Sequence, residues 1–164
     1  MKDFLIIGNM NAVTYKEVFP LIKANNLWLG VNNGDMAFRV PKDSEPRATR
    51  YWQDDTGQKW RSLGNSCWFT NLEHDVRREP LPLTKNFNPD EYERYDNFDA
   101  INVDMLSDIP KDYFGVMGVP ITYLAKHNRG GQFEIVGLRY GSNGKDLTIN
   151  GKDCYFRVLI KRKT

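Results

Sequence analysis

A short apolar run near the start of the chain sets the first limit on its fold. Residues Asp3 to Gly8 (DFLIIG) are uniformly apolar after the first position and end in a glycine. Such a run is typical of a strand buried on both faces, as in a parallel or mixed sheet. Thr14 and Glu17 then have the spacing of a helix capping box, and Pro20 is expected to kink this helix or to move its start to about Phe19.

The order of the expected elements is that of an α/β fold. Two short strands follow the helix, at 27–30 and 36–40, with Asn32, Asn33 and Gly34 as the turn between them. We expect a hairpin at 50–63 and an aromatic-rich strand at 65–72. A short helix is expected at 120–124 and a strand at 133–138. A glycine-rich turn region at 141–151 then precedes a last strand at 154–160. We therefore predict an α/β fold class, with a single domain and a mixed sheet.

The composition fits one soluble domain. The chain has 164 residues, of which 40% are hydrophobic, and this is enough for one core. No apolar run approaches the roughly 18–20 residues of a membrane span, and the start is unlike a secretion signal, so a cytoplasmic location is expected. Cys67 and Cys154 match no zinc pattern with His74 and His127, and we expect reduced thiols and no metal.

The charge is unevenly distributed, although the net charge is only +2. Residues 86–115 hold eight acidic and two basic side chains, so the rest of the chain is strongly basic. Such asymmetry indicates either a face that binds a polyanion or two solvated surfaces. On the first interpretation, the acidic stretch repels DNA and orients a duplex on the opposite side.

Three stretches of the sequence together resemble one family. They are FLIIGNMNAVTYKEVFPLIKANNLWLG from Phe4, YDNFDAINVDMLSDIPKDYFGVMGVPITYLAKHN from Tyr95, and INGKDCYFRVLIKRK from Ile149. Their order is similar to the carboxy-terminal half of the EcoRI-type adenine-specific DNA methyltransferases. The resemblance implies a doubly wound sheet, S-adenosylmethionine as the methyl donor, and an adenine extruded from the DNA before its N6 atom is methylated.

The resemblance also suggests how the chain is organised. It implies a strand–helix–strand unit at 1–40, a small β-rich insert for recognition at 41–115, and closing strands at 116–164. The methyltransferase-like sheet would then be partly truncated. A truncated sheet exposes an edge, which predicts a protein partner or a homodimer along that edge.

Two motifs that the resemblance implies are absent from this sequence. One is a glycine-bearing FxGxG loop for the methyl donor, and the other is an Asn/Asp-Pro-Pro-Phe/Tyr motif for the adenine. The sequence has no Pro-Pro pair, and Asn88-Pro89-Asp90 only begins like the second motif. We therefore predict no catalytic and no cofactor-binding residue in this chain, with S-adenosylmethionine bound only where the other half is supplied.

Two explanations of this deficit are open. In the first, the chain is a fragment or the product of a truncated gene, and it keeps the DNA-binding and recognition function of the methyltransferase. In the second, it is a stand-alone, non-catalytic binding protein derived from this half, for example a phage-encoded inhibitor of a host defence complex. DNA is the expected partner in the first case and a protein in the second.

A segment that alternates basic and aromatic residues is the main candidate for DNA contact. Cationic side chains neutralise phosphates, and exposed aromatic rings stack on unpaired bases. The alternative is a solvated hairpin whose aromatic side chains lie in the core. The candidate residues of this segment are Arg47, Arg50, Trp52, Lys59, Trp60 and Arg61.

Two smaller groups are further candidates. Asn9 and Asn11 follow the first strand, where amide side chains would line a cofactor or base pocket; alternatively they complete a turn and cap the helix. Arg157 and Lys161 are four residues apart and are expected to share one face of the last strand. They would contact phosphate or, alternatively, blunt an edge strand.

Overall fold

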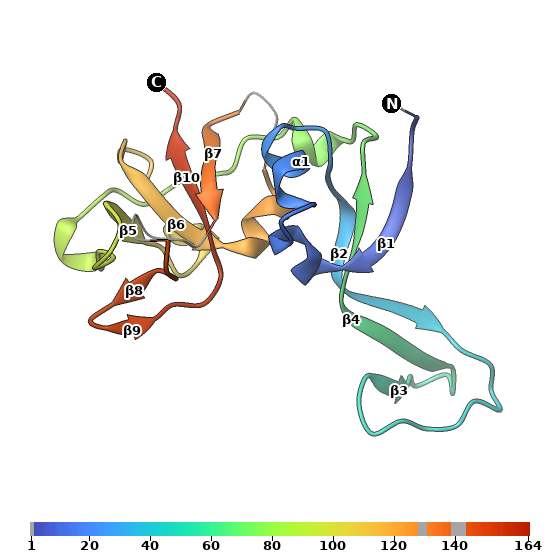
Figure 1. Ribbon diagram of the computed structural model, residues 1–164. Coiled ribbons are helices and arrows are strands. Elements are labelled where there is room, and N and C mark those ends of the chain that lie inside the picture. Colours follow the sequence, from blue (N-terminus) through green and yellow to red (C-terminus); the bar gives the residue numbers. More distant parts are fainter. Residues whose placement is uncertain (1, 128–130, 139–143) are drawn as a thin grey trace. The chain divides into compact units, whose positions relative to one another are not determined.

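The computed structural model describes residues 2–127, 131–138 and 144–164 (Figure 1). The chain folds into two compact units. Unit 1 consists of Met1–Ile22 and Asn26–Leu72, and unit 2 consists of Lys23–Asn25 and Glu73–Thr164. Each unit has its own sheet and its own core, and each is described by itself.

The sheet of unit 1 is built around one long strand, β4 (Lys59–Thr70). β1 (Leu5–Asn9) and β2 (Trp28–Arg39) lie on either side of β4, and β3 (Tyr51–Gln53) pairs with its first residues. All these pairings are antiparallel. Every strand of unit 1 therefore depends on the backbone hydrogen bonds of β4.

Two of the predicted strand breaks in unit 1 are wrong. The expected turn at Asn32, Asn33 and Gly34 does not form, because β2 runs through it as a strand of 12 residues. Two register shifts against β4 accommodate this segment instead. The hairpin strand and the aromatic-rich strand are likewise one strand, β4, whose continuity depends on a positive φ of 69° at Gly64, a conformation that favours glycine.

The prediction that the first apolar run is buried on both faces is also wrong. β1 is an edge strand that pairs with β4 on one side, and no other described strand pairs with it. The exposed fractions of Leu5, Ile6 and Ile7 are 55%, 57% and 47%. The apolar run therefore has the composition of an interior strand in the position of an edge strand.

The helical segment after β1 begins where the proline predicts and not where the capping box does. A 3₁₀ turn, η1 (Met10–Thr14), follows β1, and the α-helix α1 (Phe19–Lys23) begins at Phe19. The side chain of Asn9, rather than that of Thr14, caps the first turn. The buried hydrophobic side chains of unit 1 are Met10, Val13, Ile22, Leu27, Leu29, Val40, Cys67 and Phe69.

Unit 2 contains the predicted mixed sheet. Its strands lie in the order β5 (Ala100–Asn102), β6 (Val116–Pro120), β10 (Arg157–Arg162) and β7 (Phe133–Leu138). β5 and β6 are parallel, and the other two pairs are antiparallel. The predicted α/β class with a mixed sheet is therefore confirmed, although β10 begins three residues later than expected.

Short helices and one hairpin complete unit 2. The 3₁₀ turns are η2 (Asp75–Arg77), η3 (Pro89–Glu91), η4 (Leu106–Asp108) and η5 (Ile121–Ala125), and Pro120 precedes the last of them as predicted. β8 (Thr148–Ile149) and β9 (Lys152–Asp153) form a hairpin whose turn residues, Asn150 and Gly151, both have positive φ. Residues 139–143, which overlap the predicted glycine-rich turn region, lie outside the described residues.

The core of unit 2 depends on a close contact between Tyr95 and Gly118. The hydroxyl of buried Tyr95 donates a hydrogen bond to Oδ1 of Asn102 at 2.8 Å. A Cβ at position 118 would overlap the hydroxyl and the ring of Tyr95. Glycine in the middle of β6 therefore leaves the space that the tyrosine fills.

Gly118→Ala is expected to lower the free energy of unfolding by about 1–3 kcal/mol, because the added methyl group overpacks a buried ring. Urea denaturation followed by circular dichroism measures this change, since all four tryptophans lie in unit 1 and do not report on unit 2. Gly137→Ala in β7 is the control, since the nearest atom to its added Cβ, Cδ1 of Leu159, is 4.0 Å away. Similar losses in the two variants would show that the contact with Tyr95 is not the cause.

Candidate nucleic-acid interface

The predicted hairpin is confirmed at the end of the unit 1 sheet, where β3 pairs with β4 around the turn at 55–57. Oδ1 of Asp54 accepts hydrogen bonds from the Thr56 hydroxyl at 2.6 Å and from the backbone N–H groups of Thr56 and Gln58 at 3.0 Å. These bonds, together with that from the Trp60 indole to Oδ2, lower the pKa of Asp54 to about 2. The carboxylate therefore fixes the shape of the turn.

The side chains of the hairpin form two rows, one on each face of the sheet, and each row contains both basic and aromatic residues. Arg61 lies directly opposite Phe38 on one neighbouring strand and Tyr51 on the other. Trp60 lies directly opposite Arg39 and Trp52. Because successive side chains of a strand point to opposite faces, the row that contains Arg61 and the row that contains Trp60 are on different sides.

The row that contains Trp60 includes a parallel pair of indole rings. The rings of Trp52 and Trp60 have centroids 6.4 Å apart and an interplanar angle of 7°, and Cζ of Arg39 lies 5.4 Å from the Trp60 ring centroid. The indole N–H of Trp60 donates to Oδ2 of Asp54 at 2.8 Å. Trp60 is thus held in place, while Trp52 is the exposed ring of the pair.

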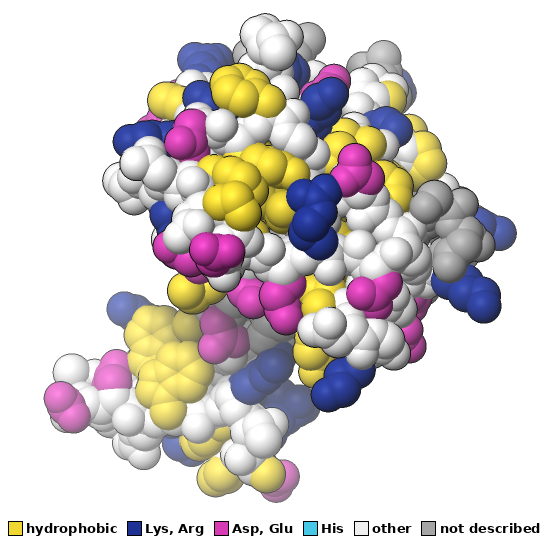
Figure 2. All heavy atoms as spheres, turned by 90° about the vertical axis from the view of Figure 1, so that its left-hand side faces the viewer, with side chains coloured by type: hydrophobic (Ala, Val, Ile, Leu, Met, Phe, Trp, Pro, Cys, Tyr) yellow, Lys and Arg dark blue, Asp and Glu magenta, His cyan; other side chains and the backbone are white. Residues whose placement is uncertain are grey.

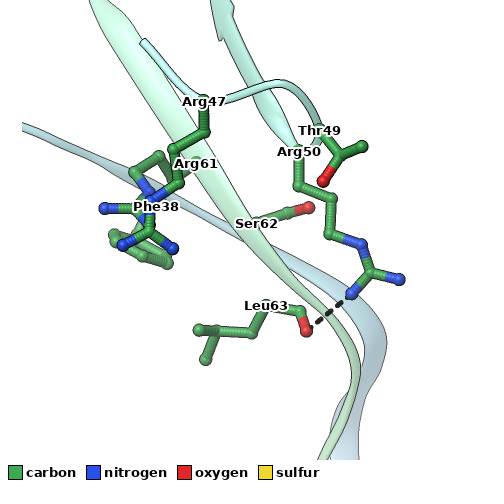
Figure 3. A pocket seen from close by; sticks show the side chains of 7 residues that line it. All are labelled: Phe38, Arg47, Thr49, Arg50, Arg61, Ser62 and Leu63. Carbon is green, nitrogen blue, oxygen red and sulfur yellow. Dashed lines mark hydrogen bonds between the residues drawn. The ribbon is translucent and has the colours of Figure 1, made fainter. Parts of the chain in front are cut away.

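The basic residues border a cavity of about 260 Å³. Figure 3 shows Arg47, Arg61 and Phe38 extending toward the same side of this pocket, and Arg50 extending to the other side. No acidic side chain lines the pocket, and among the described residues no carboxylate forms an ion pair with Arg47 or Arg61. The pocket is completed by Thr49, Ser62 and Leu63. The cavity is therefore suited to an anionic group.

Two of the predicted contact residues bond to the chain itself. Arg50 donates to the backbone carbonyl of Leu63 at 2.8 Å, as the dashed line in Figure 3 shows, and its guanidinium occupies the space that a side chain at position 64 would need. Nζ of Lys59 donates to the backbone carbonyl of Ser44 at 2.9 Å. These two bonds anchor the loop of residues 41–50, which carries Arg47, to β4.

The asparagines after β1 form a small amide cluster with a residue of β4. Asn9 accepts from the backbone N–H of Asn11 at 2.8 Å, and Nδ2 of Asn65 donates to Oδ1 of Asn11 at 2.9 Å and to Oδ1 of Asn9 at 3.3 Å. Asn9 therefore completes the turn, as the alternative interpretation expects. All three side chains are exposed, and a role in lining a ligand pocket stays a prediction.

The two basic residues of β10 differ in their surroundings. Arg157 is mostly covered, and it donates to Oδ1 of Asn102 at 3.1 Å and to Oδ1 of Asp104 at 2.8 Å. Lys161 is exposed. Their side chains share a face because the register between β10 and β6 is regular, so Lys161 is the more accessible candidate for phosphate contact.

Sequence reasoning missed several residues at these sites. Phe38 and Arg39 join the hairpin only because β2 is long enough to reach it, and the false turn at 32–34 concealed this length. A second cavity, of about 360 Å³, lies in unit 2 beside Asn102 and Arg157. No spacing in the sequence indicates it, because its lining comes from residues as far apart as Glu93 and Arg157.

The acidic stretch at 86–115 bonds largely to unit 2 itself. Asp96 accepts from the backbone N–H groups of Asn150 and Gly151, and Asp112 accepts from that of Phe87. Other carboxylates of the stretch pair with lysine or arginine. On the face drawn in Figure 2, acidic side chains are scattered among basic and hydrophobic ones, without one continuous acidic area.

The described part of the chain offers neither a metal-binding cluster nor a membrane-spanning helix. Within residues 2–127, 131–138 and 144–164, no three His, Cys, Asp or Glu side chains are grouped so that they could hold a metal ion. No helix in the same ranges has the length and hydropathy needed to cross a membrane. Both cysteines are free thiols, and burial raises the pKa of Cys67 to about 11.

Comparison with known proteins identifies the family. The family model of the adenine-specific methyltransferase EcoRI matches residues 1–163, and the chain therefore belongs to this family, which confirms the resemblance. It is 51% identical over 166 residues to the type II methyltransferase M.EcoRI of Escherichia coli, with 99% of this chain and 51% of the relative covered. It is 32% identical over 184 residues to M.MpnI of Mycoplasma pneumoniae, with 99% and 57% covered.

The chain therefore spans about half the length of the curated relatives that it matches. A third relative, the type II methyltransferase M.MgeORF184P of Mycoplasma genitalium, is 32% identical over 185 residues, again with 99% of this chain and 57% of the relative covered. No solved structure matches the chain.

The lowered pKa of Asp54 predicts how stability depends on pH. Because the folded-state pKa of about 2 lies below the ordinary value of 3.8, the carboxylate stabilises the folded state above pH 3.8, and this contribution is lost as the pH falls toward 2. Asp54→Ala removes it. The difference in urea midpoint between the native chain and the variant is expected to shrink from pH 5 to pH 2. A difference that stays constant would contradict this account.

Proposed function

We propose that this chain is the DNA-binding and recognition part of an adenine-N6 DNA methyltransferase and that it does not transfer a methyl group by itself. The arginine-lined cavity of the hairpin is the observation that carries the DNA-binding part of the proposal. Membership of the methyltransferase family supports adenine in DNA as the target. The chain supplies contacts to the duplex, and the chemistry depends on residues outside it.

The geometry of the hairpin suits a nucleic acid on chemical grounds. Arg47 and Arg61 present guanidinium groups that have no acidic partner in the described structure, and a phosphate accepts two parallel hydrogen bonds from each such group. On the opposite face, the exposed ring of Trp52 is supported from behind by Trp60, so its flat surface is available to a base. A strand end with both features can follow a backbone and contact an unstacked base.

The other predicted residues have graded roles in this proposal. Arg50 and Lys59 position the loop that carries Arg47, and they need not touch DNA themselves. Lys161 adds a phosphate contact in unit 2. Asn9 and Asn11 provide exposed amide groups at the end of β1, and such groups can form hydrogen bonds with a target base or with the donor.

The residues of this chain do not fit the methyl donor. No two glycines in the sequence have the GxG spacing, so the tight turn that lets a donor approach the backbone is missing. The arginine-lined cavity is positively charged, and it repels the cationic sulfonium of S-adenosylmethionine. We therefore assign donor binding to the part of the relatives that this chain does not match.

Arg47→Gln and Arg61→Gln are each expected to weaken binding of a fluorescent DNA duplex, because each removes a phosphate contact. The plot of log K against log salt concentration should lose about one unit of slope per variant. Fluorescence anisotropy over a salt series measures both effects. Lys16→Gln is the control, since it removes one positive charge from unit 1 at an exposed ion pair with Glu17, outside the hairpin.

The results of this titration separate the two candidate functions. Loss of affinity in the arginine variants together with normal binding by the lysine variant supports DNA recognition. No binding of the native chain to DNA at low salt would overturn the proposal. In that case a stand-alone protein that binds another protein, such as an inhibitor of a defence complex, becomes the better account.

The purified chain is expected to transfer no labelled methyl group from S-adenosylmethionine to adenine in DNA, because it lacks the donor loop and the adenine motif. Scintillation counting of duplex DNA containing many adenines measures the transfer. Full-length M.EcoRI under the same conditions is the positive control. Incorporation by the purified chain alone would refute this part of the proposal.

A further inference from the structure

The free edge of β1 has none of the features by which proteins usually protect an edge strand. Such strands are commonly interrupted by a charged residue, a proline or a bulge. Leu5–Asn9 contains no charged residue and no proline, and its pairing with β4 is regular over all five residues. The other side of β1 has no strand partner among the described residues. This edge is therefore open to another strand.

The side chains of β1 are exposed on both faces of the sheet. Leu5 and Ile7 point to one face and Ile6 to the other, because successive residues alternate. All three are about half exposed, with fractions between 47% and 57%. A solvated edge strand normally keeps one polar face, so apolar side chains on both faces indicate that covering layers are missing on both sides.

The row of Ile6 shows where the core of unit 1 stops. Ile6 lies opposite Phe69, and Phe69 lies opposite Leu29 on the next strand. Leu29 is 2% exposed and Phe69 is 7% exposed, whereas Ile6 is 57% exposed. Within one apolar row, two neighbouring residues are therefore buried and the third, on the edge strand, is exposed. This is the pattern expected where the hydrophobic core ends abruptly.

We propose that the edge of β1 accepts a strand from a polypeptide segment equivalent to the part of the relatives that this chain does not match. The curated relatives are about twice as long as the matched region, so the unmatched part is long enough to supply a strand and layers for both faces. A second strand would satisfy the open backbone groups of β1 and cover Leu5, Ile6 and Ile7. The proposal rests on the proposed function only in taking the unmatched part to be the donor-binding half.

A second copy of this chain is the competing occupant, and it accounts for less. Pairing of two β1 edges would satisfy the backbone groups of this strand, as pairing with any other strand would. Each copy would bring the same incomplete edge, and neither would bring an element that the other lacks. A segment with different elements can cover both faces of β1, and for this reason we favour it over the homodimer.

Co-expression tests the proposal directly. The full chain with an affinity tag is expressed together with the unmatched part of Escherichia coli M.EcoRI as a separate polypeptide. We expect the two to purify together in a 1:1 complex. Ile6→Lys in β1 is expected to reduce the recovered partner at least about tenfold, because the lysine would be buried without a counter-ion. Val31→Lys on β2, which also replaces an exposed apolar residue, is the control and should leave recovery unchanged.

Hydrogen exchange provides a second measurement on the same samples. The amides of Leu5–Asn9 are expected to exchange more slowly in the complex than in the chain alone, while those of Arg61 and its neighbours are unchanged. Purification of the native chain without the partner would overturn the proposal. A dimer of the chain alone in sedimentation velocity, lost in Ile6→Lys, would overturn it in favour of the second copy.

The two proposals fail separately. Complex formation without DNA binding would leave the strand partner in place and refute DNA recognition. DNA binding by the chain without complex formation would refute the strand partner and leave DNA recognition in place.

Discussion

The pairing of β4 with three other strands is the interaction on which unit 1 depends. The second half of β4 carries the core residues Cys67 and Phe69 and holds β1, while β2 pairs with both halves. The first half carries Trp60 and Arg61 and holds β3. Because a single strand serves both regions, the candidate interface is positioned by the same backbone hydrogen bonds that form the core. Gly64, with its positive φ, lies between the part of β4 that forms the hairpin and the part that forms the core.

The division of labour within the hairpin follows from strand geometry. Neighbouring residues of a strand cannot share a face, so Arg61 and Trp60 lie in two different rows. The row that contains Arg61 borders a cavity without acids, and the row that contains Trp60 presents a stacked aromatic ring. Residues that looked equivalent in the sequence therefore differ: Arg47 and Arg61 are available to a ligand, whereas Arg50 and Lys59 hold a loop.

Local patterns predicted much of this fold. The hairpin around the turn at 55–57, the start of α1 at Phe19 and the strand β7 all follow from turn chemistry, proline geometry and apolar runs. The continuous strand at Asn32, Asn33 and Gly34 was not predicted. These residues favour a turn, but because β4 continues beside them they are accommodated in β2 by register shifts. Pairing partners that are distant in sequence overrode the local preference.

The site was predictable to the extent that its residues are close in the sequence. The cluster from Arg47 to Arg61 is a local feature, and its candidate residues lie together in the hairpin. The exposure of β1 was not predictable, because an apolar run is typical of a covered strand and does not say whether the rest of the chain provides the cover. The ion pair between Arg157 and Asp104 was not predicted either, since an ion pair between residues distant in the sequence leaves no local pattern.

The anchoring of the loop at 41–50 has a consequence for how a family of this kind can diversify. Both anchors, Arg50 to Leu63 and Lys59 to Ser44, end on main-chain oxygens, which every amino acid possesses. The side chains at positions 44 and 63 can therefore change without loss of the acceptor. The loop can therefore keep its shape while the side chains at these two positions change, and such changes leave the packing of the sheet intact.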